Sequence, residues 1–424
     1  MTEKLLHFIW QFQYFSSIGL LTTQDETVQI IHPGTLNHNQ GPDFLSGKIN
    51  ISGNVWAGNI ELHVRSSDWL LHDHSSDKNY NNVILHVVWL DDRDITVKNN
   101  RAIPTLELQS RVSNLLLAKY NDLMQSHTFI PCENQIHQVN PVIITGLKNR
   151  MLAERLHEKS MEVRAYLKAT NNNWEECFWW VIAAGFGSTL NKDQFRQVAQ
   201  SLPHILLAKH KNQPLQIEAL VFGQAGLLDH DFTDSYPVML RKEYNFLTKK
   251  YSLEKANAPL FFLRMRPANF PTIRLAQLAV LISKSSHLFS MIKEATTLSE
   301  IKNFFTLEAN DYWHYHYTFD ELSPFKVKSL GSLMINNIII NTVSPMLFAF
   351  GSIHNDENIK DKAMRWLEEL SPEKNTIING FKNLGVNCKN SFESQALLQL
   401  KKHYCDVKRC LECAVGNAII KKVT

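Results

Sequence analysis

The sequence has no long hydrophobic run, little excess charge and only six cysteines among its 424 residues. No window approaches about 18 uninterrupted apolar residues, so we expect no transmembrane helix and no membrane partner. The opening residues, MTEKLLHFIWQFQYF, contain no small-residue cleavage site, which argues against a signal peptide. Six unevenly spaced cysteines do not form a disulfide scaffold, so a reducing cytoplasm is the expected location.

The small net charge of +3 excludes a histone-like polycation, and 44% hydrophobic residues with 20% charged residues indicate a folded protein. The charge is nevertheless uneven. Residues 1–130 carry a balance of −4 and eight of the 18 histidines, whereas the remaining residues carry +7. This split favours metal chemistry in the first part and an anionic partner in the second.

The spacing of apolar residues predicts an α+β protein. An amphipathic helix is expected over residues 4–16 and another over 110–123. Between them, short β-branched runs separated by turn residues predict strands over 27–31, 44–51, 55–64, 83–89 and 102–108. We expect an α/β domain over residues 1–125, a linker over 126–141, and a larger all-helical domain over 142–424.

Two motifs in the strand region carry carboxylates. GPDF, at residues 41–44, begins one expected strand, and ELH, at residues 61–63, lies in the next. Alternation along a strand places Glu61 and His63 on one face. Asp43 on the neighbouring strand could then complete a site for a divalent metal ion. The alternative interpretation is that these side chains are purely structural.

The order of helix, strand, P-D strand and E-x-polar strand resembles the restriction-endonuclease-like superfamily, the PD-(D/E)-x-K nucleases. The resemblance implies a metal-dependent nuclease or phosphodiesterase in which Asp43 and Glu61 bind Mg²⁺ or Mn²⁺. His63 stands where the family has its lysine, and it could serve as a base or a third ligand. This departure favours an alternative, a degenerate nuclease fold that acts as a non-catalytic binding scaffold.

A second polar cluster follows in the segment SDWLLHDHSSD, residues 67–77. His72 and His74 form a His-x-His pair that could ligate one metal ion, with Asp77 as a further ligand. A metallohydrolase centred on these three residues is therefore another candidate. The alternative is a polar loop whose side chains bond the backbone. His86, flanked by apolar residues, is expected to be buried.

The C-terminal segment YCDVKRCLEC contains Cys405, Cys410 and Cys413. A C-x-x-C pair suits a metal ion, and Cys132 in the linker is the best candidate for a fourth ligand, with His403 in reserve. Such a site could hold Zn²⁺ or an iron–sulfur cluster. The alternative is that these are reduced, partly buried thiols of a terminal helix.

The basic surplus includes LRMRPANFPTIRLAQ, residues 263–277. Arg264, Arg266 and Arg274 lie near an expected helix start and could bind nucleic acid through its phosphates. The aromatic segment DYWHYHYTF, residues 311–319, could stack bases. The alternatives are arginines that close helix junctions and aromatic residues that belong to the core.

Several motifs together resemble a bacterial family of unknown function, the domain-of-unknown-function family 2851. The resemblance spans nearly the whole chain and implies no assigned activity. These motifs are GPDF, GNIELHVRSSDW, HDH, NVILHVV, FIPCEN, FGQAGLL, LRMRPANFPTIRLAQ and YC-x4-CLEC.

Overall fold

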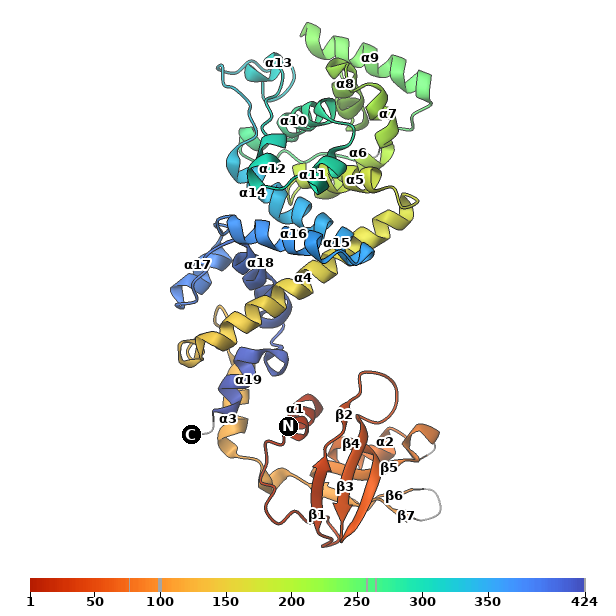
Figure 1. Ribbon diagram of the computed structural model, residues 1–424, viewed down its shortest axis with the longest axis vertical. Coiled ribbons are helices and arrows are strands. Elements are labelled where there is room, and N and C mark those ends of the chain that lie inside the picture. The colour runs from red at the N-terminus through yellow and green to blue at the C-terminus, as the bar shows by residue number, and fades with distance from the viewer. Residues whose placement is uncertain (76, 98–100, 257, 264, 423–424) are drawn as a thin grey trace. The chain divides into compact units, whose positions relative to one another are not determined.

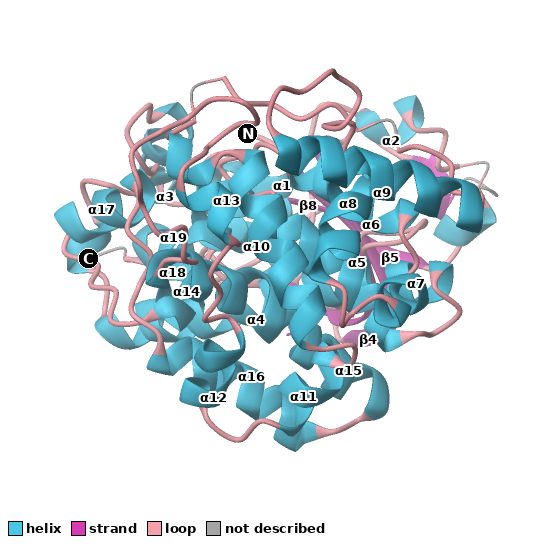
Figure 2. Ribbon diagram, turned by 90° about the horizontal axis from the view of Figure 1, so that it is seen from above, coloured by secondary structure: helices cyan, strands magenta, loops and turns pink. Residues whose placement is uncertain are grey.

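The computed structural model describes residues 1–75, 77–97, 101–256, 258–263 and 265–422. The chain forms two compact units, each described by itself below. Unit 1 comprises residues 1–147 and 400–424, and unit 2 comprises residues 148–399. Strands lie in unit 1 and helices predominate elsewhere (Figures 1 and 2), which confirms the α+β class.

Unit 1 is built on a mixed sheet with the strand order β1-β3-β4-β5-β8, and β2 pairs with β3 at its edge. Strands β1, β3 and β4 are antiparallel neighbours, whereas β5 and β8 run parallel to β4. The strands are β1 (Val28–His32), β2 (Thr35–Leu36), β3 (Phe44–Ile51), β4 (Asn54–Arg65), β5 (Val83–Leu90) and β8 (Thr105–Glu107), with a separate pair β6 (Thr96–Val97) and β7 (Arg101–Ala102).

The β3–β4 hairpin fixes the register of the sheet. Its two turn residues, Ser52 and Gly53, have φ angles of 47° and 86°, as a tight turn between twisted strands requires. The next connection must cross to a parallel strand, so it is longer and contains the helix α2 (Asp68–Leu71) and the short turn η1 (Lys78–Tyr80). These two elements therefore lie between β4 and β5 in the chain.

Both faces of the central strands are covered. The first six residues of β5, VILHVV, are all buried, as in parallel strands generally. Helix α1 (Glu3–Gln11) contributes buried Leu5, Leu6, Phe8, Ile9 and Trp10. It ends earlier than the helix expected over residues 4–16, because Gln13 adopts a left-handed conformation with φ 56°.

The C-terminal residues belong to unit 1, although the sequence placed them with the helical domain. Lys408 Nζ donates a hydrogen bond to the carbonyl oxygen of Met124, and α19 packs on α3. These contacts join segments almost 300 residues apart in the chain, which sequence patterns cannot reveal. The elements are α3 (Asn114–Gln125), η3 (Gln109–Arg111), η4 (Ile136–Gln138), η7 (Lys401–Cys405), η8 (Cys410–Glu412) and α19 (Ala414–Lys421).

Unit 2 is helical, as expected. Helix α4 (Pro141–Ala169) contributes its residues from 148 onward, and Asn173 caps α5 by accepting a hydrogen bond from the backbone of Glu176. The other elements are α5 (Trp174–Phe186), α6 (Lys192–Ser201), α7 (His204–Lys209), α8 (Pro214–Gln224), α9 (Ser235–Tyr251), η5 (Pro267–Asn269), α10 (Pro271–Lys284), α11 (Leu288–Glu294), α12 (Leu298–Phe304), α13 (Asp311–His314), α14 (Ser332–Ile338), η6 (Ile339–Val343), α15 (Ser344–His354), α16 (Glu357–Glu369), α17 (Thr376–Asn383) and α18 (Ser391–Leu400).

One helical stretch of unit 2 is long and apolar enough to cross a membrane. It covers Ser332–His354, and 61% of its most apolar window is buried inside the protein. Burial of this kind is also typical of the core helix of a soluble protein. The consecutive helices α10 and α11 pass the same test only as a pair bent by 72°.

Candidate metal centre

Asp43 and Glu61 are brought together by the pairing of β3 with β4. The backbone amide of Asp43 donates a hydrogen bond to Glu61 Oε2 at 3.0 Å. In return, the amide of Leu62 donates to Asp43 Oδ2 at 3.0 Å. Each carboxylate is therefore anchored to the backbone of the other strand, which holds the two acids side by side.

The second oxygen of Glu61 faces two imidazoles. Glu61 Oε1 lies 3.3 Å from His74 Nε2 and 3.7 Å from His63 Nε2. Glu61 is only 4% exposed. Burial raises the pKa of its carboxyl group, and the nearby charge of Asp43 adds to this effect, although His74 opposes it. A positive charge at this point would stabilise the carboxylate.

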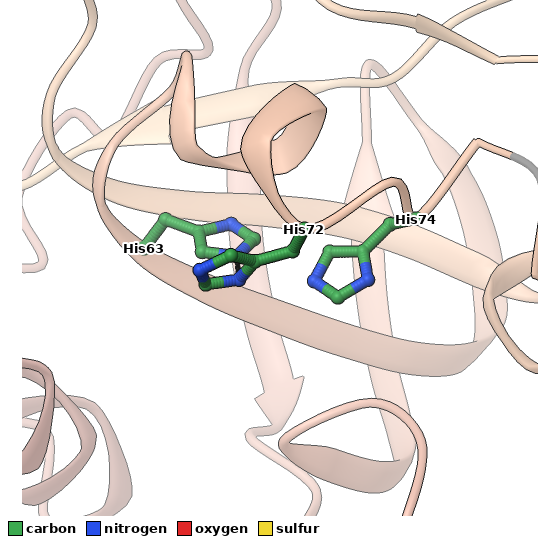
Figure 3. A group of neighbouring side chains, drawn as sticks. All are labelled: His63, His72 and His74. Carbon is green, nitrogen blue, oxygen red and sulfur yellow. Dashed lines mark hydrogen bonds between the residues drawn. The ribbon is translucent and has the colours of Figure 1, made fainter.

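Three histidines converge beside Glu61. Potential ligand atoms of His63, His72 and His74 all lie within 4.8 Å of one another. Figure 3 shows His63 on β4, with His72 and His74 reaching toward it from the turn after α2. His63 Nε2 and His72 Nδ1 are 3.2 Å apart. His63 and His74 are buried, whereas His72 is exposed and opens the group to solvent.

His86 orients His63 from behind. His63 Nδ1 and His86 Nε2 are 2.9 Å apart, so one ring donates a hydrogen bond to the other. Burial, reinforced by neighbouring imidazoles, lowers the pKa of His63 to about 2 and that of His86 to about 3. Both rings are therefore neutral near pH 7, the form in which an imidazole binds a metal ion. The expectation that His86 is buried is confirmed.

Aromatic side chains fix the histidine group from the other side. His74 stacks on Tyr80 with ring centroids 3.8 Å apart. Trp69 is fully buried, and its indole packs edge-on against His63, His74 and His86. The rings are thus held by packing as well as by polar contacts, which preorganises the site.

His7 is a member of the site that the sequence did not single out. Its Nε2 lies 3.1 Å from Asp43 Oδ2, and both side chains are about one quarter exposed, at 23% and 24%. Burial lowers the pKa of His7, but the bond to Asp43 and its charge outweigh this, so the net shift is upward. The available signal was a single histidine in the otherwise apolar segment LLHFIW.

Asp77 has a different role from the one expected. Of the described residues, the metal-competent histidine group contains His72 and His74 but not Asp77. Asp77 is exposed and caps η1, where its carboxylate accepts a hydrogen bond from the amide of Asn79 at 2.9 Å. Asp68 likewise accepts from the amide of Arg65. In the segment 67–77, Asp68 and Asp77 therefore bond the backbone, whereas the two histidines could bind a metal ion.

Four cysteines gather in unit 1. Cys132, Cys410 and Cys413 are buried, and Cys405 is partly buried. Burial raises the pKa of the Cys132 thiol to about 12, and the proximity of Cys413 and Cys410 adds to this rise. The Cys405 pKa is raised for the same reasons, with Cys132 and Cys413 among its neighbours. The structure therefore brings Cys132 to the C-terminal cysteines, although the chain separates them by more than 270 residues.

Of the three arginines expected to contact nucleic acid, the two that the structure describes differ in burial. Arg264 lies outside the described residues. Arg266 is exposed at the start of η5, whereas Arg274 is buried in α10. In the aromatic segment, Trp313 is fully buried and stacks on Phe222. That ring therefore belongs to the core of unit 2.

Comparison with known proteins supports one assignment. No curated protein and no solved structure matches the chain. A family profile described as "Protein of unknown function (DUF2851)" matches residues 3–376. Because that match covers most of the 424 residues, the chain belongs to the DUF2851 family, as its motifs had indicated.

Proposed function

We propose that this protein is a divalent-metal-dependent hydrolase of phosphodiesters, with a nuclease-type site in unit 1. His63, His72, His74 and Glu61 would hold the metal ion. The observation that carries the proposal is the convergence of three imidazoles, two of which also lie within 4 Å of the buried Glu61 carboxylate. Asp43 and His7 lie beside this group, on its partly exposed side.

The spacing of the donor atoms fits a metal ion. Ligands about 2.05 Å from a tetrahedral zinc ion are about 3.3 Å apart from one another. Three donor pairs are close to this value: His63 and His72 at 3.2 Å, His74 and Glu61 at 3.3 Å, and His63 and Glu61 at 3.7 Å. The ligand atoms of the three histidines all lie within 4.8 Å of one another. A ligand set of three nitrogens and one oxygen favours Zn²⁺ over Mg²⁺. Of Mg²⁺ and Mn²⁺, the two ions expected from the sequence, it favours Mn²⁺.

The surrounding residues would prepare the site for hydrolysis. His86 fixes the ring of His63 so that Nε2 points to the ligand group, an arrangement common around metal-bound histidines. His7, whose pKa is raised beside Asp43, can hold a proton for a leaving group. When bound, the metal ion would supply Lewis-acid polarisation of a phosphoryl oxygen and activate a water molecule.

The chain order of unit 1 also supports the nuclease interpretation. Helix α1 comes first, then the antiparallel strands that carry Asp43 and Glu61, then α2 and a parallel strand. This order is in line with the resemblance to the restriction-endonuclease-like superfamily. The position of that family's lysine is taken here by His63, whose neighbours are other imidazoles. The substitution suits a site with nitrogen ligands.

The experiment combines metal analysis with hydrolysis. Purified protein would be stripped of metal, reloaded separately with Zn²⁺, Mn²⁺ or Mg²⁺, and assayed on bis(p-nitrophenyl) phosphate, single-stranded DNA and RNA. Glu61→Gln and His72→Ala should each lose metal and activity, because each removes a ligand. Asp77→Asn is the matched control, since its exposed carboxylate lies in the same segment but outside the group.

Two results would overturn the proposal. One is hydrolysis that persists at the wild-type rate in both ligand variants. The other is one bound metal equivalent in wild type and both variants alike, without hydrolysis of any substrate. The second result would leave a binding scaffold as the better account. Loss of activity in both His72→Ala and Asp77→Asn, with Glu61→Gln still active, would move the chemistry to the alternative site predicted around His72, His74 and Asp77.

The four cysteines favour a separate structural site. We also propose that Cys132, Cys405, Cys410 and Cys413 bind Zn²⁺ or an iron–sulfur cluster that joins the linker to the C-terminal segment. The burial of three of the thiols and the mutual electrostatic effect of the four on the thiol pKa support this, because a metal ion that replaces the thiol protons adds its binding free energy to folding. Cys410→Ser should release the metal, and visible absorption distinguishes a coloured cluster from colourless zinc. Full metal content in Cys410→Ser would reject the site.

A further inference from the structure

Unit 2 contains a cavity of about 910 Å³ that the proposed hydrolase does not use. Its walls come from α4, α5, α10, α14 and the loop after α13. Seven basic and two acidic side chains line it. The volume lies within the range of about 300–1,000 Å³ that small-molecule sites occupy. The cavity is therefore large enough for an organic ligand and selects for negative charge.

Arg274 is the most constrained cation in this cavity. It is 8% exposed, and its guanidinium donates to Gln277 Oε1 at 2.9 Å and to Asn269 Oδ1 at 2.6 Å. Both acceptors are neutral. Among the residues that the structure describes, its buried Nε atom has no hydrogen-bond partner. One donor of this guanidinium, which lines the cavity, is therefore left without a protein acceptor in the described part of the chain.

Lys328 is a second buried cation with neutral partners. It is 4% exposed, and its Nζ lies 3.1 Å and 3.4 Å from the carbonyl oxygens of Lys326 and His314. The same ammonium lies 3.9 Å from the ring centre of Tyr317. Gln277 connects the Arg274 guanidinium to the backbone of Lys328, because its amide donates to the carbonyl oxygen of Lys328 at 3.2 Å while its oxygen accepts from Arg274.

Three other basic side chains of the cavity have carboxylate partners. Lys159 and Lys192 pair with Glu162, at 2.9 Å and 3.8 Å. Arg196 pairs with Asp193 at 2.6 Å. Arg274 and Lys328 differ from these residues in being more deeply buried and in having only neutral partners. Buried charges are normally paired, since desolvation of an isolated ion is costly.

We propose that this cavity binds an organic phosphate of nucleotide size, with Arg274 and Lys328 contacting the phosphate group. Two positive charges that line one cavity match the dianion of a phosphate monoester better than a single carboxylate. A guanidinium fork and an ammonium are also the usual phosphate donors of proteins. Asn341 and Tyr166 line the remaining space and provide polar groups for the organic part.

The test measures binding in the presence of EDTA by isothermal titration calorimetry. The probes are AMP, ATP, inorganic phosphate and citrate, each titrated into the full chain. We expect AMP or ATP to bind more tightly than citrate, and Arg274→Gln to weaken that binding on the order of tenfold or more. Lys242→Gln is the matched control, because Lys242 is exposed on α9 and does not line the cavity.

A second pair of variants covers the case in which Arg274→Gln does not fold. Lys326 is exposed at the cavity wall, and Lys192 is only partly buried, so Lys326→Glu and Lys192→Glu leave the core intact. Each should lower affinity for the nucleotide several-fold by charge repulsion. Affinity equal to wild type in both, tighter binding of citrate than of every phosphate, or no binding of any phosphate probe overturns the proposal.

The inference is independent of the proposed hydrolase. Glu61→Gln, which should abolish metal-dependent hydrolysis, should leave nucleotide binding to unit 2 unchanged. Failure of the nucleotide-binding proposal can therefore be distinguished from failure of the hydrolase proposal. Nucleotide binding lost in Glu61→Gln but retained in Arg274→Gln would place the nucleotide at the metal centre and reject the cavity.

Discussion

The buried polar groups of the two units favour ligands of opposite charge. In unit 1, burial holds His63 and His86 neutral while a carboxylate lies beside them, which prepares the site for a cation. In unit 2, burial surrounds Arg274 and Lys328 with neutral partners, which prepares the cavity for an anion. Burial thus favours a cation beside an uncompensated carboxylate and an anion beside an uncompensated guanidinium or ammonium group.

The two sites also differ in how the chain assembles them. Apart from His7, the metal centre comes from residues 43–86, within one hairpin and one crossover. The cavity collects residues between 155 and 373, and of its walls only the segments 263–277 and 311–319 were recognisable as motifs in the sequence. A short segment leaves a recognisable spacing in the sequence, whereas the remaining walls, assembled by helix packing, do not.

His63→Ala should produce the largest effect. The substitution removes a ligand nitrogen and also the ring that His86 orients, so metal affinity in unit 1 should fall on the order of 1,000-fold. Nucleotide affinity in unit 2 should not change. Equilibrium dialysis with Zn²⁺, alongside calorimetry with AMP, measures both. A parallel loss of nucleotide binding would show that the two sites are not separate.

Glu218 should make the folding stability of unit 2 depend on pH. Burial raises its carboxyl pKa to about 7, although bonds from Tyr236, Trp313 and Asn310 oppose the rise. The folded state then binds this proton more tightly than the unfolded state, whose pKa is near 4.5. The stabilisation is present below pH 4.5 and is lost as pH rises through about 7, on the order of 3 kcal/mol.

Glu218→Gln is the control for that prediction, since an amide resembles the protonated acid. Thermal unfolding of unit 2 followed by calorimetry should become less dependent on pH between 4.5 and 7 in this variant. An unchanged pH profile would contradict the assignment of the effect to Glu218.

A methyl group added at Gly223 should destabilise unit 2 while sparing the metal centre. A Cβ at this position would lie 2.2–2.4 Å from ring atoms of Tyr244, which α8–α9 packing cannot accommodate. We expect Gly223→Ala to lower the free energy of unfolding by about 1–3 kcal/mol. Gly331→Ala is the matched control, because Gly331 also lies in unit 2 and a Cβ there would meet no atom of the described residues within 4 Å. Denaturant melts compare the two, and equal stability would refute the steric account.

The smallest predicted change concerns His86, which touches the metal site only through His63. His86→Gln keeps a polar group near His63 but removes the imidazole that fixes the tautomer of His63. Metal affinity should fall about tenfold, the lower end of the range for residues behind a metal ligand. Zn²⁺ titration against a competing chelator measures the change. A loss as large as that of His63→Ala would instead make His86 a direct ligand.

Local sequence patterns predicted much of the sheet. The strand expected over residues 44–51 is found with those bounds, and those expected over 55–64 and 83–89 differ by one residue at an end or at both. The strand expected over 102–108 is divided, because Pro104 lies between β7 and β8. The two-residue strand β2 was missed, since so short a segment carries no measurable alternation.

The mixed α+β class, the strand periodicity and the nearness of Asp43, Glu61 and His63 could be predicted from local sequence, because neighbouring strands bring such residues together. The three-dimensional structure was needed to show that His7 joins Asp43, that Asp77 caps a turn and that Arg274 lines a cavity. Periodicity records which face of an element is apolar. It does not record which distant element covers that face. Tertiary packing decides which polar groups become buried in the same site.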